Sequence, residues 1–341
     1  MATHRFETAS PIFHRGWQRH IAQSLITGVA SEKLVEEMVL SGFERAFAKH
    51  QVAECESTAA IEAGRAVFRR QSKNRALFEA MAETARQSHY GNGSIKKRLT
   101  AEHFYEQYFW RNTPVVLQNL MADWPALERW TPEFFAERYG NELIEITSER
   151  ESDPLFEANL DQHRSQIRMR DYVRRIKQCT DATNDFYLVA KNGLMAKEAF
   201  RGLLDDIPAP AGFLDPAMSG SHHIGLWFGP AGTVTPLHHD GSNILLGQIR
   251  GRKLVKLISP FFLDYLYSSQ ACFSDVDLEQ VDYERFPLMR KVEILTITLE
   301  AGEFLFIPIG WWHWVKALEV SISVSFQNFI FSNGTIVLEL Q

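Results

Sequence analysis

Hydrophobic and polar positions follow two different periods along this chain, and the change falls near residue 100. Apolar residues recur every three to four positions between Ser31, a predicted N-cap, and Gly42, a predicted helix stop. The same period returns from about Thr58 to Gln87 among many charged residues. We therefore expect helices in both stretches.

A linker is expected directly after these helices. Residues 89–94 read His-Tyr-Gly-Asn-Gly-Ser, which are turn-forming residue types. We place a domain boundary there, with an N-terminal helical region over residues 1–95 and a second domain over 96–341. The basic run 96–98 is then expected to be a solvated linker face rather than a phosphate site.

From about Thr100 the pattern changes to mixed helix and strand, and after Gly225 to short apolar runs separated by Gly and Pro. A helix is expected at 103–108 and a strand at 114–117. Further strands are expected at 226–228, 244–249, 254–258, 292–299, 304–307 and 320–326. This succession favours an α+β fold that is mainly β, a double-stranded β-helix of the jelly-roll or cupin kind, preceded by the helical region.

Charge and cysteine usage exclude several classes of protein. A net charge of −6 argues against a nucleic-acid binder, which carries clustered basic residues. Three separated cysteines, Cys55, Cys179 and Cys272, suggest neither a disulfide framework nor a zinc knuckle. No apolar stretch approaches the roughly 18 residues of a membrane helix, so we expect no membrane partner and a cytoplasmic location.

One short motif carries candidate metal chemistry. In His238-His239-Asp240, the first and third side chains point the same way on extended backbone, while His239 faces elsewhere. Two imidazoles and one carboxylate on one face of an iron ion leave positions open for other ligands. About 0.5 such pairs are expected by chance in a chain of this composition, so the motif needs support from its context.

Three flanking segments supply that context. They are residues 229–236 (GPAGTVTP), 248–253 (QIRGRK) and 302–314 (GEFLFIPIGWWHW). Together they resemble the JmjC, or cupin-like, branch of the 2-oxoglutarate- and Fe(II)-dependent dioxygenases, and within it the factor-inhibiting-HIF type of protein hydroxylase and its bacterial relatives. The resemblance spans about residues 100–330.

The resemblance implies that His238, Asp240 and His313 are the catalytic ligands of Fe(II), with 2-oxoglutarate and O2 as cosubstrates. A lone histidine beside tryptophans is more often a packed core residue. Pro308 and the Trp311-Trp312 pair stand in the family's register, which favours the ligand interpretation of His313.

Lys253 is the candidate anchor of the cosubstrate. Strand alternation places it on the face of Val255 and Leu257, so its ammonium would enter the barrel. The alternative is that it belongs to a solvated basic run. A buried lysine needs a counter-charge, and the resemblance supplies one in the distal carboxylate of 2-oxoglutarate.

Three further residues are assigned to the cosubstrate by the resemblance. Thr235 and Tyr187 match positions that hydrogen-bond the same carboxylate, and Ser325 falls where the hydroxylase has an asparagine near the cosubstrate. The alternating serines of 321–325 would line either the barrel or a solvent face. Gln327 and Asn243 depart from the hydroxylase pattern, so the resemblance does not carry over its substrate.

The implied function is hydroxylation of a C–H bond, with release of succinate and CO2, on a peptide or protein side chain. The alternatives are a small-molecule or peptide natural-product hydroxylase, an N-methyl-lysine demethylase, and a non-catalytic cupin that binds a ligand. Most demethylases of the family have Glu rather than Asp as the second ligand. The N-terminal helices serve either dimerisation or substrate recruitment, and no oligomeric state is predicted.

Overall fold

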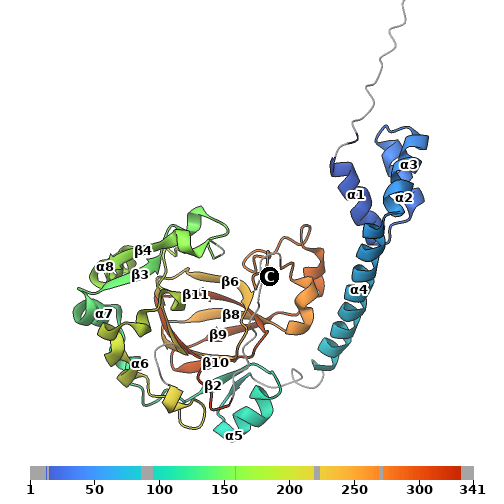
Figure 1. Cartoon of the computed structure of the whole chain (residues 1–341). Coiled ribbons are helices and arrows are strands. Elements are labelled where there is room, and N and C mark those ends of the chain that lie inside the picture. The colour runs from blue at the N-terminus through green and yellow to red at the C-terminus, as the bar shows by residue number, and fades with distance from the viewer. Residues whose placement is uncertain are drawn as a thin grey trace, which may run out of the picture. The chain divides into compact units, whose positions relative to one another are not determined.

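The structure, a computed structural model, describes residues 13, 15–85, 95–157, 159–218, 223–268 and 272–331. Its contacts divide the chain into two compact units, Met1–Met81 and Ala82–Gln341, shown in Figure 1. The linker predicted at 89–94 lies outside the described residues. The boundary predicted at 95–96 stays a prediction.

The N-terminal region is helical, as predicted. Its helices are α1 (Arg15–Ile26), α2 (Ser31–Leu40), α3 (Arg45–Glu56) and α4 (Ala59–Ala85). Gly42 follows α2 with a φ of 95°, a conformation that glycine adopts without strain, which confirms the predicted stop. Ser31 as an N-cap is wrong: it is the first helical residue, and its hydroxyl donates to Glu56 Oε2 at 2.6 Å.

The second unit is a jelly roll with helices packed on it, which confirms the predicted fold class. Its six-stranded sheet has the order β1 (Lys96–Lys97), β2 (Val115–Gln118), β10 (Glu303–Ile307), β7 (Ile244–Arg250), β12 (Ser321–Phe326), β5 (Ile224–Gly229). Its four-stranded sheet has the order β6 (Val234–His239), β11 (Trp312–Ala317), β8 (Lys253–Ile258), β9 (Leu295–Leu299). A separate ribbon pairs β3 (Leu143–Thr147) with β4 (Arg164–Arg168). The α-helices are α5 (Ala101–Phe104), α6 (Ala126–Arg129), α7 (Pro132–Tyr139) and α8 (Met169–Gln178).

Strand alternation builds a core on each face of each sheet. On β10, Leu305 and Ile307 pack between the two sheets, while Phe304 and Phe306 pack on the opposite side against the helical layer. A third cluster covers the outer face of the four-stranded sheet and includes residues of the 262–289 segment. The space between the sheets is therefore apolar where Leu305 and Ile307 lie, so a polar side chain that enters it needs a partner.

The basic run 96–98 is not a solvated linker face. Lys96 and Lys97 form β1, which pairs in parallel with β2, and Lys96 Nζ lies 2.7 Å from Glu303 Oε2. Burial works to raise the pKa of Glu303, but hydrogen bonds from Lys96 and Gln118 outweigh it and hold that pKa below its usual range. Lys96 and Lys97 thus belong to the sheet, and Lys96 neutralises a buried carboxylate.

Candidate metal centre

Strands β6 and β11 bring two distant histidines together. His238 lies opposite His313 in the antiparallel register, and their ring centroids are 4.1 Å apart. Val315, two residues after His313 on β11, lies opposite Thr235, which is three residues before His238 on β6. Strand β6 therefore carries one extra residue between the two pairs. This β-bulge turns Thr235 and His238, three residues apart, toward the same side of the sheet.

Asp240 joins the two histidines from the turn after β6. Its backbone carbonyl accepts a hydrogen bond from the Gly310 N–H at 3.2 Å, which ties this turn to the loop before β11. Its carboxylate Oδ2 lies 3.4 Å from His313 Nε2. One ligand atom from each of His238, Asp240 and His313 lies within 4.8 Å of the others, a spacing that could hold a metal ion.

Backbone carbonyls fix the proton positions of both rings. The Nδ1 of His238 lies 2.8 Å from Pro236 O, and that of His313 lies 3.1 Å from Trp311 O. A carbonyl oxygen only accepts, so each Nδ1 donates and each Nε2 keeps its lone pair. Burial lowers the pKa of His238, and the neighbouring His313 lowers it further, so this imidazole is neutral at pH 7. Two imidazoles and a carboxylate fit a divalent ion such as Fe(II).

Two asparagines position the loop that precedes His313. Asn243 Oδ1 accepts from the Ile309 N–H at 2.9 Å, and Asn112 Nδ2 donates to Ile309 O at 3.0 Å. The Trp311 indole N–H donates to Asn112 Oδ1 at 2.8 Å. The sequence marked Asn243 as a departure from the hydroxylase pattern, and the structure gives it a structural role at the entrance to β11.

Lys253 lies on the face of β8 that points into the barrel. Its residue is 2% exposed, and Nζ lies 3.1 Å from the Tyr187 hydroxyl oxygen and 5.7 Å from the Trp227 ring centroid. The Trp227 indole N–H is buried without a hydrogen-bond partner among the described residues. An ammonium and an unsatisfied N–H are donors that a carboxylate would satisfy. The residues present therefore fit a carboxylate ligand in the barrel.

Comparison with known proteins decides the family. The model of the cupin-like domain matches residues 101–329, which include every strand of the second unit from β2 to β12. The chain belongs to the cupin-like, JmjC-domain family.

Three relatives of this JmjC protein illustrate the family. Lysine-specific demethylase JMJ30 of Arabidopsis thaliana is 34% identical over 68% of this chain and 54% of its own length. Lysine-specific demethylase 8 of Xenopus tropicalis is 32% identical over 66% and 50%. Jumonji C domain-containing protein 5 of Drosophila melanogaster is 32% identical over 66% and 57%. The chain thus spans about half the length of the curated relatives it matches.

The family confirms the predicted cofactors, because JmjC oxygenases use Fe(II), 2-oxoglutarate and O2. None of these three relatives is named a factor-inhibiting-HIF-type hydroxylase, so that finer resemblance stays a prediction. Every helix in the described part of the chain is too short or too polar to span a membrane.

The remaining cosubstrate candidates of this JmjC domain also face the space between the sheets. Thr235 is buried opposite Val315, and Ser325 is partly buried opposite Gly225. The described contacts join Lys253 to Tyr187 but do not extend to either of these hydroxyls. The roles of all four residues therefore stay predictions.

The alternating serines of β12 do not form a solvent face. Ser321 and Ser323 are fully buried, and both hydrogen-bond the Gln248 side chain, Ser323 by donating to Oε1 at 2.7 Å. This satisfied network closes part of the interior beside the apolar residues. The open question from the sequence is thus settled in favour of the barrel.

Phe273 is a site residue that the sequence did not reveal. Its ring stacks on His238 with centroids 5.5 Å apart. The His239 N–H donates to Cys272 O at 3.1 Å, and the Ser274 N–H donates to Leu237 O at 2.9 Å. The segment 272–274 therefore lies along the edge of β6, where Phe273 pairs with His238 and its ring packs on the His238 ring. No local pattern marks Phe273, because it meets His238 only after the chain has folded.

Arg150 was missed for the same reason. It is 1% exposed, its Nη2 donates to Val234 O at 2.6 Å, and its guanidinium carbon lies 5.3 Å from the Tyr187 ring centroid. Burial lowers the pKa of Arg150 against the opposing effect of Glu157. A cation buried against Tyr187 restrains the ring whose hydroxyl meets Lys253.

Gly229 leaves the space that this tyrosine occupies. A Cβ at Gly229 would lie 2.6 Å from Tyr187 Cδ2, whereas a Cβ at Gly202 would have its nearest neighbour at 4.0 Å. We expect Gly229→Ala to displace the ring, to lower the free energy of unfolding by about 1–3 kcal/mol and to weaken cosubstrate binding. Thermal unfolding with and without 2-oxoglutarate checks this, with Gly202→Ala as the matched control. Equal melting of the two variants would contradict the tight packing at Gly229.

Proposed function

We propose that this protein is an Fe(II)- and 2-oxoglutarate-dependent oxygenase that oxidises a C–H bond of a peptide or protein substrate. The observation that carries the proposal is the ligand geometry. The Nε2 atoms of His238 and His313 keep their lone pairs and meet the Asp240 carboxylate within 4.8 Å. Three protein ligands leave positions for a chelating oxoacid and dioxygen.

The residues of the chain have separate tasks in this proposal. His238, Asp240 and His313 hold iron, and the carbonyls of Pro236 and Trp311 orient the two rings. Bound iron supplies the oxidation, in which 2-oxoglutarate loses CO2 and leaves as succinate while one oxygen atom enters the substrate.

The cosubstrate lies between the iron and Lys253. Lys253 stands four residues from Leu257, the residue opposite His313, which is about 13 Å of strand. The Lys253 side chain and a five-carbon dicarboxylate would together span this separation. Lys253, with Tyr187 and Thr235, binds its distal carboxylate, and Ser325 lies near its other side. The apolar residues between the sheets exclude water from the reaction.

Two reactions on a peptide share this chemistry. Hydroxylation of a side-chain carbon leaves the new hydroxyl in place. Hydroxylation of an N-methyl carbon instead gives a hemiaminal that breaks down to formaldehyde and the free amine. The names of two relatives as lysine-specific demethylases favour the second reaction. Asp240 as the second ligand favours the first.

Anaerobic titration tests the proposal. Fe(II) and 2-oxoglutarate added to the apoprotein are expected to give the weak visible charge-transfer band of a metal-chelated oxoacid. The readout precedes turnover and needs no peptide substrate. Folded protein that gives no band would refute the oxygenase and favour a non-catalytic cupin. Formaldehyde release from methyl-lysine peptides then separates demethylation from hydroxylation. Hydroxylation adds one oxygen atom, about 16 mass units, to the peptide and releases no formaldehyde.

A further inference from the structure

Lys191 is an exposed lysine that lies beside the metal cluster. Its Nζ is 5.7 Å from the centroid of the Phe273 ring, and that ring stacks on His238 with centroids 5.5 Å apart. Within the described part of the chain, no carboxylate pairs with the Lys191 ammonium. The Asp240 carboxylate is itself 34% exposed, so the cluster is open to solvent. A ligand that approaches it on this side meets an unpaired cation.

The chain runs along one face of β5 from Tyr187 to Lys191. A Cβ at Gly229 would lie 2.6 Å from the Tyr187 ring, and a Cβ at Gly225 would lie 2.5 Å from Ala190 Cβ. These two glycines share a face of β5 by alternation. Lys191 therefore follows directly from residues that pack on the interior of the barrel.

The turn that carries Lys191 is held by hydrogen bonds. It is a short 3-10 helix over Ala190–Asn192. The Asn192 side-chain oxygen accepts from the Val189 N–H at 2.9 Å, and its amide donates to Glu145 Oε1 at 3.0 Å. The backbone is thus fixed, and only the lysine side chain itself decides how far the ammonium reaches.

The charge of Lys191 acts on the residues around the cluster. Burial and the neighbouring His313 lower the pKa of His238 most, and the Lys191 ammonium adds to this lowering. Burial raises the pKa of the Cys272 thiol, and the same ammonium opposes that rise. Both effects agree with the position of Lys191 over the ring of Phe273.

Other charges near the interior of the barrel cancel and leave that of Lys191. Glu157 lies 3.5 Å from the buried Arg150, and these two form an ion pair. Asp240 and Lys253 carry opposite formal charges. A divalent iron ion and the dianion of 2-oxoglutarate also cancel. The uncompensated charge is therefore positive with or without metal and cosubstrate, and Lys191 carries it.

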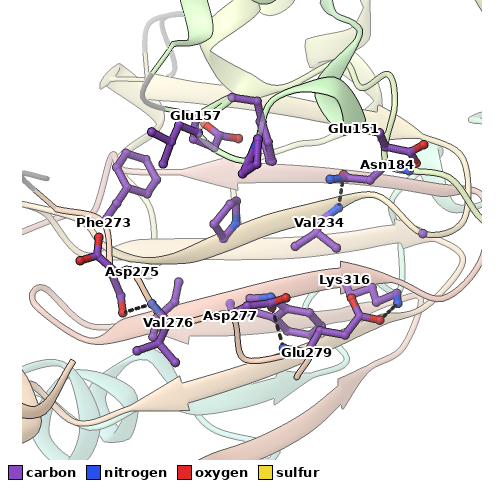
Figure 2. Close-up of a pocket in the computed structure, with 18 of the residues that line it drawn as sticks. Glu151, Glu157, Asn184, Val234, Phe273, Asp275, Val276, Asp277, Glu279 and Lys316 are labelled. Atoms are coloured by element: carbon purple, nitrogen blue, oxygen red, sulfur yellow. Dashed lines mark hydrogen bonds and ion pairs between the residues drawn. The ribbon is translucent and has the colours of Figure 1, made fainter. Parts of the chain in front are cut away.

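A neighbouring groove has the opposite charge. Phe273 also lines this groove, which has a volume of about 810 Å³ and lies on the outer face of the four-stranded sheet (Figure 2). Its lining holds five carboxylates against two cationic side chains, and Lys191 is not among the described residues that line it. An acidic side chain is therefore repelled along the groove and attracted at Lys191, which favours one carboxylate at one position.

We infer that Lys191 selects a substrate that carries a carboxylate beside the carbon to be oxidised, such as an aspartyl or glutamyl side chain. Ammonium and carboxylate form a charge-assisted hydrogen bond once the substrate displaces water between them. The same ammonium repels the cation of a methylated lysine, so hydroxylation is favoured over demethylation. The inference rests on the proposed function for the reaction, whereas recognition of the carboxylate needs no iron.

A peptide mixture tests this selection. Pentapeptides with neutral flanks of Gly, Ala, Ser and Phe carry Asp, Asn, Lys or trimethyl-lysine at the centre. They are passed over the immobilised full chain, once without metal and once with Mn(II) and 2-oxoglutarate, and mass spectrometry measures what is retained. Asp and Asn have nearly the same shape, so their ratio isolates the charge. We expect Asp to be retained roughly three- to tenfold more than Asn, and both lysine forms less than Asn. Equal retention of Asp and Asn would overturn the inference.

Variants of Lys191 locate the selection. Lys191→Ala should remove the preference for Asp over Asn, and Lys191→Glu should reverse it in favour of the Lys peptide, a gain that a misfolded protein does not give. Lys33→Glu is the matched control, because Lys33 is an exposed lysine of α2 in the other compact unit. It should keep the wild-type selection. The same change in Lys191→Glu and Lys33→Glu would show a response to net charge only and would overturn the assignment.

Titration of 2-oxoglutarate into the iron-loaded protein separates substrate selection from cosubstrate binding. Lys191→Ala should change the cosubstrate affinity less than about twofold, since the ammonium is exposed. A larger loss with unchanged peptide selection would make Lys191 a cosubstrate residue and overturn the inference. Selection of Asp peptides by a protein that gives no iron–oxoacid band would keep the recognition of a carboxylate and refute the oxygenase. An iron–oxoacid band without this selection would do the reverse.

Discussion

His238→Ala and Asp240→Ala are each expected to abolish iron-dependent formation of succinate from 2-oxoglutarate. Each removes one of three ligands that meet within 4.8 Å, and two remaining ligands hold a labile divalent ion poorly. We expect the affinity for Fe(II) to fall more than about 100-fold in either variant, since changes to groups that only orient metal ligands already cost about 10- to 100-fold. Anaerobic metal titration and succinate release measure the two effects separately.

His239→Ala is the matched control for this pair. His239 lies between the two ligands in the sequence, but its ring packs edge-on against Trp312 at 4.7 Å and does not join the cluster. This variant should keep its iron affinity and lose only packing energy. Full succinate formation in His238→Ala or Asp240→Ala would refute the assignment of these residues as iron ligands. Loss in all three variants would point to a folding defect instead.

Alternation made part of the site predictable from the sequence. Lys253 shares its face with Val255 and Leu257, and these two residues pack between the sheets, so the direction of Lys253 followed from the period of two. The same argument predicted that the His239 ring points away from His238 and Asp240, and that ring packs against Trp312. Which residues of one strand share a face follows from their spacing in the sequence, so it could be predicted.

At the bulge in β6, strand alternation no longer predicts which face a side chain takes. A regular strand would send Thr235 and His238 to opposite faces, because they are three residues apart. One extra residue opposite β11 restores both to the interior. The sequence contains no signal for this insertion, since it depends on the register between two strands about 75 residues apart in the chain.

Contacts between distant segments explain the other omissions. Phe273 reaches His238 from the excursion between β8 and β9, and Arg150 reaches Tyr187 from the turn after β3. Strands β6 and β11 were themselves not predicted, because Pro236 interrupts the first and tryptophans crowd the second. Family resemblance supplied the candidate metal ligands before their strands were identified, whereas packing partners outside the motifs had to be seen in the structure.

Lys253→Met is expected to weaken the binding of 2-oxoglutarate without lowering the stability of the ligand-free protein. Nζ is buried with a hydrogen bond to the Tyr187 hydroxyl, and no carboxylate is described beside it. Replacing such a cation with an apolar chain of similar length is neutral or stabilising for a protein without ligand. Affinity for 2-oxoglutarate should instead fall roughly 10- to 100-fold, since a hydrogen bond to a charged group contributes about 1.5–3 kcal/mol.

Melting temperatures measured with and without 2-oxoglutarate test both halves at once. The wild-type protein should gain stability with added cosubstrate, because a ligand that binds the folded state shifts unfolding by mass action. Lys253→Met should melt at the same or a higher temperature alone and gain little from the cosubstrate.

Lys256→Met is the matched control, because Lys256 lies on the opposite face of β8, where its Nζ donates to Leu278 O at 2.5 Å. It should keep the full response to 2-oxoglutarate. A lysine retained only for the fold would give the opposite result, with lower stability in Lys253→Met and an unchanged response. The direction of the shift without ligand therefore decides between a structural and a cosubstrate-binding role for Lys253.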